Sequence, residues 1–317
     1  MKLTEIDLKL LNYLYHNHNE PISKISKATK ISRDKVEYRL NKYLKTGFIK
    51  QFIPIINYKQ LGYNEQIVLL LKFETKKQAE EYSKQLKNNK HCISHGTTFE
   101  KYDLYVNGIF KNNQEIEEFL KKILENKNYF LEEYLIINPY FVELYPLKIL
   151  NNQEKENYNL KEIIQKKITV DELDLKILKE LSKNGRIKLL DLSLKLKNNP
   201  TTILYRLKKL KENKIILGNR ILFDTKQIGY LYTTILINFK SQNAVKQIKQ
   251  FARKSKNTNS LILNLHKPNA VIQFFYKKEQ EIRKEIKELE KALENEKITI
   301  ERMDLDEEEH VNTMPFY

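Results

Sequence analysis

The sequence predicts an α+β fold that is built twice in one chain. The segment that begins at Glu172 aligns without a gap on the segment that begins at Glu5. Of the 59 positions from Glu5 to Tyr63, 18 are identical in the second copy, which far exceeds chance. Each copy opens with apolar residues at helical spacing and continues with strand-like segments. This order indicates one helical and one mixed domain per copy.

The charge of the chain is concentrated in the two repeated segments. The net charge is +16, from 57 basic and 41 acidic residues. Residues 1–65 carry +6 of it and residues 168–230 carry +7. Such an excess of positive charge favours a polyanionic partner. Nucleic acid is the first candidate and an acidic membrane the second.

Composition excludes several other classes of protein. A single cysteine, Cys92, rules out an intrachain disulfide framework, and seven glycines argue against a glycine-rich nucleotide-binding fold. The first 20 residues lack the pattern of a signal peptide, and no apolar run approaches the ~18 residues of a membrane helix. We therefore expect a cytoplasmic protein without a membrane association.

The opening segment of each copy predicts a winged helix-turn-helix. Apolar spacing predicts a first helix over 4–16, Pro21 opens a short second helix, and Ser32 caps a third that ends at Gly47. Val36, Leu40 and Leu44 are its expected inward side chains. The β-rich segment 48–56 is interrupted by proline, which is typical of an edge hairpin. The second copy repeats this plan, with Pro200 at the start of its third helix.

The third helix of a helix-turn-helix enters the major groove of DNA. Its outward side chains are basic or hydroxyl-bearing, so they suit phosphates and base edges. The expected DNA-binding residues are Ser32, Arg33, Lys35, Tyr38, Arg39 and Lys42 in the first copy, and Asn199, Thr201, Thr202, Tyr205, Arg206 and Lys209 in the second. A solvated helix face is the plain alternative, and the duplicated placement weighs against it.

The rest of each copy predicts a ferredoxin-like βαββαβ domain. The first has strands at 66–74, 91–98, 102–110 and 130–144, with helices at 76–88 and 113–126. The second has strands near 231–239, 260–266, 270–276 and 297–304, with helices near 242–254 and 278–295. The predicted domains are 1–63 and 168–230 (winged helix-turn-helix), 64–146 and 231–305 (βαββαβ), 147–167 (an ordered linker) and 306–317 (a frayed tail whose Phe316 and Tyr317 are available for docking).

The first copy resembles the Lrp/AsnC family of transcription regulators. The resemblance lies in the run from "IDLKLL" through "ISRDKVEYRLNKYLKTGFIK" to "LGY", which places Leu61-Gly62-Tyr63 just before the βαββαβ domain. It implies a DNA-binding regulator whose βαββαβ domain dimerises and, in many members, senses a small effector such as an amino acid. This chain differs by carrying two units. We expect its two βαββαβ domains to pair within the chain, so that the two winged helix-turn-helix domains face two half-sites of DNA. The differing recognition helices predict an asymmetric target, and further assembly of chains stays open.

The resemblance also implies a location for an effector site. In the family it lies near the loop that joins the two central strands. The matching residues are Gly96, Thr97, Thr98, Tyr102 and Asp103, with Asp103 as the partner of an amino group. The alternative is that Gly96 makes a turn and Asp103 caps it. The second copy lacks the glycine and the acid there.

Two other functions remain open from the sequence. Sirohaem decarboxylases share the two-domain plan and would need His or Arg side chains in the βαββαβ cavity. The candidates are His91, Cys92, His95 and His266, which are more commonly structural. A non-specific architectural DNA-binding protein also fits the charge. We expect no catalysis and no cofactor. We also expect no metal site, because His91, Cys92 and His95 lack a fourth ligand.

Overall fold

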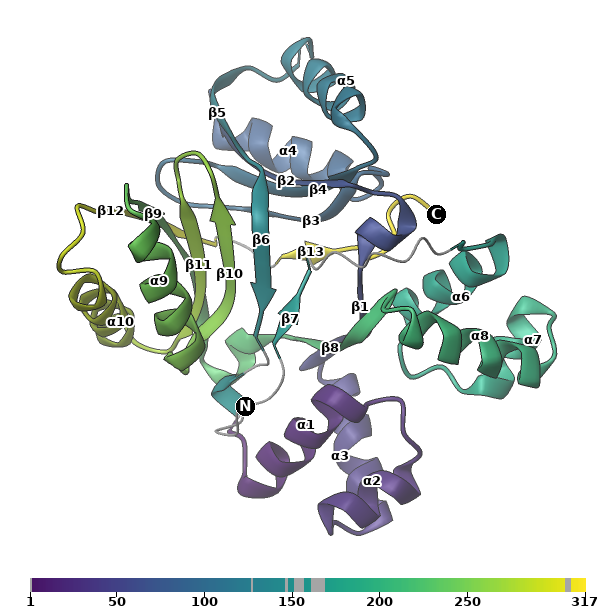
Figure 1. Cartoon of the computed structure of the whole chain (residues 1–317). Helices are drawn as coiled ribbons and strands as arrows, with labels where there is room; N and C mark the ends of the chain where they lie inside the picture. Colours follow the sequence, from purple (N-terminus) through teal and green to yellow (C-terminus); the bar gives the residue numbers. More distant parts are fainter. Residues whose placement is uncertain (1, 127, 146–147, 151–156, 161–168, 306–308) are drawn as a thin grey trace.

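The computed structural model describes residues 2–126, 128–145, 148–150, 157–160, 169–305 and 309–317. Two three-helix domains, which we call head 1 and head 2, extend from a body of two sheets (Figure 1). Head 1 contains α1 (Glu5–Asn17), α2 (Ile22–Thr29) and α3 (Arg33–Lys45), and head 2 contains α6 (Glu172–Lys183), α7 (Leu189–Leu196) and α8 (Pro200–Glu212).

Local capping sets the ends of the head helices. Thr4 and Asp7 form a capping box at the start of α1, and Asp171 and Asp174 form the same box at the start of α6. Ser32 is the N-cap residue of α3, although its side chain accepts no capping hydrogen bond from the described residues. The prediction for Leu44 was wrong: its side chain is 44% exposed, and Tyr43 is buried instead.

The predicted edge hairpin is instead one strand that pairs with the other copy. β1 (Ile49–Ile56) runs antiparallel to β8 (Ile216–Phe223), so the strand after head 1 is bonded to the strand after head 2. The register places Ile53 opposite Arg220, and these are equivalent positions of the repeat. The two-stranded ribbon β1/β8 therefore joins both heads to the body.

The body contains two βαββαβ units, as the sequence predicts. The first comprises β2 (Glu65–Phe73), α4 (Lys76–Leu86), β3 (Cys92–Thr97), β4 (Leu104–Phe110), α5 (Asn113–Leu124) and β5 (Leu131–Ile137). The second comprises β9 (Leu231–Asn238), α9 (Gln242–Lys254), β10 (Thr258–Asn264), β11 (Ala270–Tyr276), α10 (Glu279–Ala292) and β12 (Thr299–Asp304). Short 3-10 helices lie at Tyr58–Leu61, Lys148–Leu150 and Thr225–Ile228.

The two sheets exchange strands. The predicted strand 130–144 breaks at Asn138, and its second part, β6 (Pro139–Leu144), pairs with β10 of the other unit. In return, β13 (His310–Val311) pairs with β3. The resulting sheets have the orders β13-β3-β4-β2-β5 and β12-β9-β11-β10-β6-β7, where β7 is Tyr158–Asn159.

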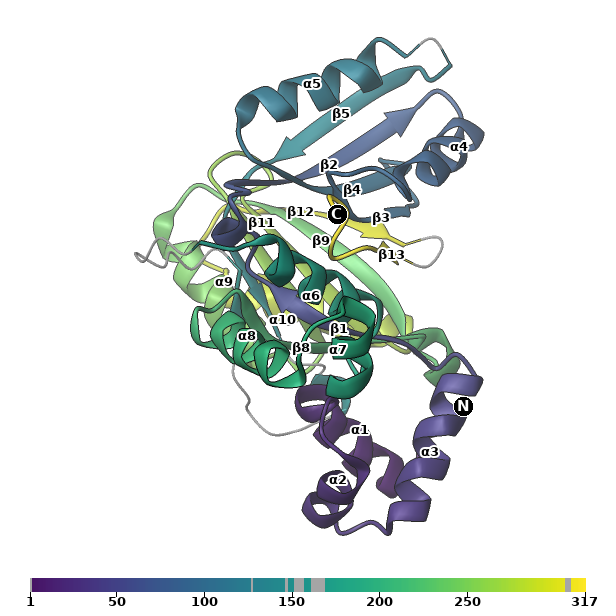
Figure 2. The ribbon, with the colours of Figure 1, turned by 90° about the vertical axis from the view of Figure 1, so that its right-hand side faces the viewer.

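The sheets pack face to face with their helices outside. α4 and α5 cover the outer face of one sheet, and α9 and α10 cover the outer face of the other (Figures 1 and 2). An apolar cluster that includes Leu70, Tyr105, Leu236 and Val271 lies between the inner faces. The two βαββαβ units therefore pair within one chain.

The described part of the C-terminal tail is docked and not frayed. Met314 is buried in the core of head 2, and the ring of Phe316 lies 4.4 Å from that of Tyr63. Tyr58 donates a hydrogen bond of 3.0 Å to the carbonyl of Thr313. Most of the predicted linker falls outside the described residues. No helix in the described part of the chain is long and apolar enough to cross a membrane.

Candidate nucleic-acid interface and the cavity between the sheets

Most of the predicted DNA-binding residues of α3 lie on an open surface. Ser32, Arg33, Lys35, Tyr38 and Lys42 are exposed, and the side chain of Tyr38 is 67% accessible. Arg33 stands at the first turn of the helix, which is the part of a recognition helix that meets base edges. This face of head 1 is therefore open to solvent.

Arg39 does not belong to this open face. Its guanidinium forms an ion pair with Asp7 of α1, and Tyr43 donates to the same carboxylate oxygen. Burial raises the pKa of Asp7, but hydrogen bonds from Thr4, Tyr43 and Arg39 outweigh it and lower the pKa to about 2. Arg39 therefore ties α3 to α1, and its contact with DNA stays a prediction for a side chain that is 23% exposed.

Head 2 shows the same division of roles. Asn199, Thr201, Thr202 and Tyr205 are exposed, while Lys209 is half-buried. Asn199 is the N-cap of α8, and its Oδ1 accepts hydrogen bonds from the amide (3.0 Å) and the hydroxyl (2.8 Å) of Thr201.

Arg206 is the counterpart of Arg39, and it also binds within its own head. Its Nη1 lies 2.6 Å from Asp171 and 3.3 Å from Asp174. Arg206 is likewise engaged within head 2, and its contact with DNA stays a prediction. The identical Asp and Arg in both copies were a sequence signal for this internal pair, because they lie 32 residues apart in each.

The two heads present different chemistry. The open face of α3 carries three basic side chains, whereas that of α8 carries an amide and hydroxyls. Head 2 also exposes Leu190, Leu194 and Leu204, where the repeat places Ser23, Lys27 and Glu37 in head 1.

Direct contacts between the two heads form a junction that fixes them relative to each other. Arg186 of head 2 donates a hydrogen bond to the carbonyl of His18 in head 1, and its guanidinium lies 5.7 Å from the ring centre of Phe52. The amide of Gly185 donates to the carbonyl of Phe52 at 2.9 Å. Burial lowers the pKa of His18 to about 3, and the Arg186 charge acts in the same direction. His18 is therefore neutral at physiological pH.

The acid of the predicted effector set is already paired. Asp103 is buried, and it accepts hydrogen bonds from the ammonium of Lys72 and the backbone amide of Phe73, both at 3.0 Å. Both carboxylate oxygens are thus engaged, so the expected contact of Asp103 with a ligand amino group is not supported.

The other four residues of the set lie close together, since the hydroxyl of Thr98 donates to the carbonyl of Tyr102 at 2.8 Å, but they do not converge on one cavity. Gly96 lies within β3 and makes no turn, and a Cβ there would come within 2.8 Å of Leu305. Tyr102 donates to Glu133 at 3.1 Å, and the buried hydroxyl of Thr97 has no partner among the described residues. Of the five, Thr98 alone borders the cavity between the sheets as described.

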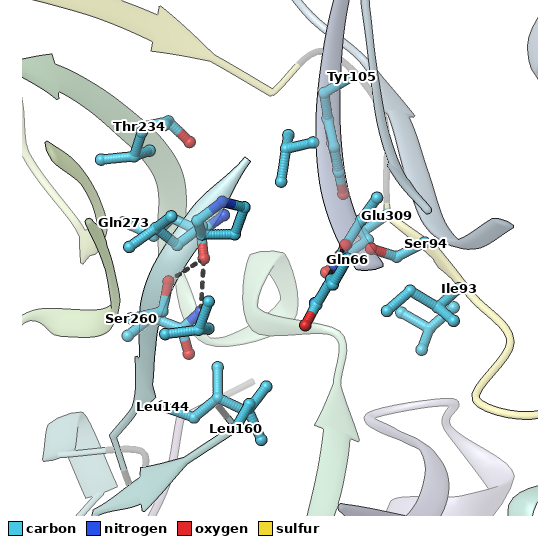
Figure 3. Close-up of a pocket in the computed structure, with 18 of the residues that line it drawn as sticks. Gln66, Ile93, Ser94, Tyr105, Leu144, Leu160, Thr234, Ser260, Gln273 and Glu309 are labelled. Carbon is cyan, nitrogen blue, oxygen red and sulfur yellow. Dashed lines mark hydrogen bonds between the residues drawn. The ribbon is translucent and has the colours of Figure 1, made fainter. Parts of the chain in front are cut away.

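That cavity has a volume of about 160 Å³, and residues of the ribbon β1/β8 form part of its lining. Gln273, Thr234 and Ser260 project from one sheet toward it, opposite Gln66, Ser94, Tyr105 and Glu309 (Figure 3). A second cavity of about 380 Å³ adjoins it and shares lining residues with it, which include Arg220, Tyr232 and Asn259.

The four residues considered for a tetrapyrrole do not line this cavity in the described structure. His91 stacks on Phe110 at 4.7 Å, and His95 bonds to Ser83 of α4 at 3.0 Å. Cys92 is buried beneath the helices, and His266 is exposed in the loop between β10 and β11. Among the described residues, no group of three or more His, Cys, Asp or Glu could hold a metal ion.

Comparison with known proteins agrees with the heads and the body. A family model for winged helix-turn-helix DNA-binding domains matches residues 3–50 and 170–216. The HTH-type transcriptional regulator FL11 of Pyrococcus furiosus is 31% identical over 121 residues, which cover 38% of this chain and 80% of that protein. The leucine-responsive regulatory protein of Haemophilus influenzae is 44% identical over 55 residues, 17% of this chain and 33% of that protein.

The likeness to solved structures extends over the whole chain. The siroheme decarboxylase NirDL has a TM-score of 0.66 and 13% sequence identity, with 99% of this chain and 96% of that chain covered. At this identity the likeness describes the fold, which is a fused pair of helix-turn-helix and βαββαβ units. With its two helix-turn-helix heads and its relatives among the regulators, the chain belongs to the Lrp/AsnC family.

Proposed function

We propose that the chain is a sequence-specific transcription regulator that binds two half-sites of duplex DNA and catalyses no reaction. The observation that carries this proposal is the presence of two exposed recognition faces, on α3 and α8, in one chain. The junction at Gly185 and Arg186 supports it, since heads held at a fixed separation suit half-sites at a fixed spacing.

The two half-sites should differ in sequence. Arg33 and Lys35 suit guanine and phosphate, whereas Thr201 and Thr202 suit phosphate oxygens and thymine methyl groups. We therefore expect an asymmetric operator, with the stronger salt dependence at the half-site of head 1.

A salt-titrated binding assay on genomic and random duplex fragments tests this function. The matched variants are Arg33→Ala in head 1, Thr202→Ala in head 2 and Lys246→Ala on α9, a basic residue far from the heads in the sequence. Selective binding that the first two variants weaken and the third leaves unchanged supports the proposal. Equal binding to all fragments would favour an architectural protein, and no binding at moderate salt would refute both.

A tetrapyrrole enzyme is the competing function, because NirDL shares the fold. The directions of His91, His95 and His266 away from the cavity weigh against it. Addition of an iron porphyrin to the purified chain distinguishes the two. A shifted, saturable absorption band would favour the enzyme, and an unchanged spectrum favours the regulator. A small effector remains part of the proposal, although Asp103 is no longer its candidate partner.

A further inference from the structure

Arg220 is an unusual residue for its place in the fold. It projects from β8, is half-buried, and lines both cavities between the sheets. The equivalent residue of the first copy is Ile53, which lies directly opposite in the ribbon and lines the same cavity. One copy therefore carries a fixed positive charge where the other keeps an apolar wall.

The charge of Arg220 is incompletely compensated. Its Nη2 donates to Oδ1 of Asn259 at 3.0 Å, which is a neutral partner. Arg220 also shares a hydrogen bond with the hydroxyl of Tyr15. Its charge acts on the hydroxyl of Tyr232, where the charge of Glu309 acts in the opposite direction. No ion pair joins Arg220 to a carboxylate in the described parts of the chain, whereas Arg39, Arg206, Arg253 and Arg302 each have one. A guanidinium presents five donors, so capacity remains for an anion.

The residues around Arg220 indicate which kind of anion the cavity could hold. Leu70, Ile262 and Val271 supply apolar walls in the smaller cavity, and amide and hydroxyl groups stand between them. Glu309 lines both cavities, and in the smaller one it projects from the side opposite Gln273 and Ser260 (Figure 3). A second negative charge on the ligand would meet this carboxylate, so one carboxylate is the limit.

We propose that the cavity between the sheets binds a small organic acid that has an apolar body and a single carboxylate, with the carboxylate on Arg220. A guanidinium fits a carboxylate through two parallel hydrogen bonds, and the apolar walls exclude water from them. Plain carboxylic acids and apolar amino acids share this chemistry. They differ in the ammonium group, for which Glu309, which lines the same two cavities as Arg220, is the acceptor.

The location of Arg220 couples this site to the heads. β8 follows head 2 directly and is bonded to β1, which follows head 1. An anion on Arg220 therefore acts on the ribbon that joins both heads to the body. This coupling rests on the proposed function, whereas the binding site itself does not.

Calorimetry on the full chain tests the site with 4-methylpentanoate as the probe. Its neutral isostere, 4-methylpentanamide, and L-leucine are the comparison ligands. The acid should bind at least about tenfold more tightly than the amide, because a charge-assisted pair is lost. Leucine binding would identify an amino acid source, with Glu309→Gln weakening leucine and sparing the plain acid.

Two variants and a control complete the test. Arg220→Ile, which installs the residue of the other copy, should weaken acid binding at least about tenfold, and Arg220→Lys should retain part of it. Arg283→Met on α10 removes an exposed guanidinium and should change nothing. The site is overturned if neither acid nor leucine binds, if acid and amide bind equally, or if Arg220→Ile binds unchanged. The comparison of acid with amide needs no variant, so it stands even where Arg220→Ile unfolds. Failure of the wild-type chain to bind DNA would refute the proposed function and leave this result intact.

Discussion

Replacement of Asp7 by Asn should destabilise head 1, because Asp7 is the common acceptor that ties α3 to α1. Its carboxylate is 9% exposed and receives Arg39, Tyr43 and Thr4. The pKa of Asp7 falls from 3.8 to about 2 in the folded chain. At 1.36 kcal/mol per unit, this shift contributes on the order of 2 kcal/mol to folding at neutral pH.

The pH dependence has a definite sign. A carboxyl whose pKa is depressed by folding stabilises the native state above its unfolded pKa, here 3.8. That stability is lost as the pH falls from 3.8 toward 2. The difference between wild type and Asp7→Asn should therefore be full at pH 7 and small near pH 2.

Native-state hydrogen exchange is the suitable assay, because it reports the opening of each domain separately. Amides of α1 and α3 should lose on the order of 2 kcal/mol of protection in Asp7→Asn, while those of α9 and α10 stay unchanged. Lys42→Ala, a change at an exposed residue of α3, is the control and should have no effect. Equal protection in Asp7→Asn and wild type at pH 7 would refute the assigned role of Asp7.

Three further predictions follow from individual contacts. Arg33→Ala should weaken DNA binding and reduce the slope of log K against log salt by about 1, which a salt titration measures. Gly185→Ala should cost about 1–3 kcal/mol in urea unfolding, because the new Cβ would lie 2.7 Å from His18 Nε2 and 3.0 Å from the Phe52 carbonyl. Unchanged stability would contradict this prediction, because it would show that the residues around Gly185 move to accommodate the Cβ. Burial lowers the pKa of His95 from 6.5 to about 4, with smaller contributions from nearby charges. Because the buried imidazole stays neutral while the unfolded one protonates, the folded state loses stability as the pH falls from 6.5 toward 4, on the order of 3 kcal/mol in all. His95→Gln should flatten this part of the pH profile of unfolding, and an identical profile would contradict the assignment.

Local features of the sequence predict the elements of the fold well. The prolines at Pro21 and Pro200 and the period of apolar residues predict helix boundaries that the structure reproduces closely. These signals lie within one turn of helix or a few residues of strand, so they need no knowledge of tertiary contacts.

Long-range pairings escape such an analysis. The segment 48–56 has the composition of an edge strand, but its partner β8 lies more than 150 residues away. The crossing of β6 into the second sheet is equally non-local. A hydrophobic pattern identifies a strand and the face it buries, but not the strand it pairs with.

The candidate site divides along the same line. Exposure of Tyr38 and Tyr205 follows from helical spacing, and both are confirmed as open surface. Arg39 lies next to that face, but it forms an ion pair with Asp7, which lies on another helix. Helical spacing within α3 could not predict this pair. Arg220 was missed because its role depends on a cavity that forms when the two sheets meet, although its mismatch with Ile53 in the repeat was visible.

Selection of bound sequences from a randomised duplex pool tests the central claim most directly. The full chain should enrich two dissimilar half-sites at one fixed spacing. Arg33→Ala should reduce the enrichment of one half-site, and Thr202→Ala should reduce the enrichment of the other. A single enriched half-site, two identical half-sites, or no enrichment over the starting pool would contradict a regulator with two different heads.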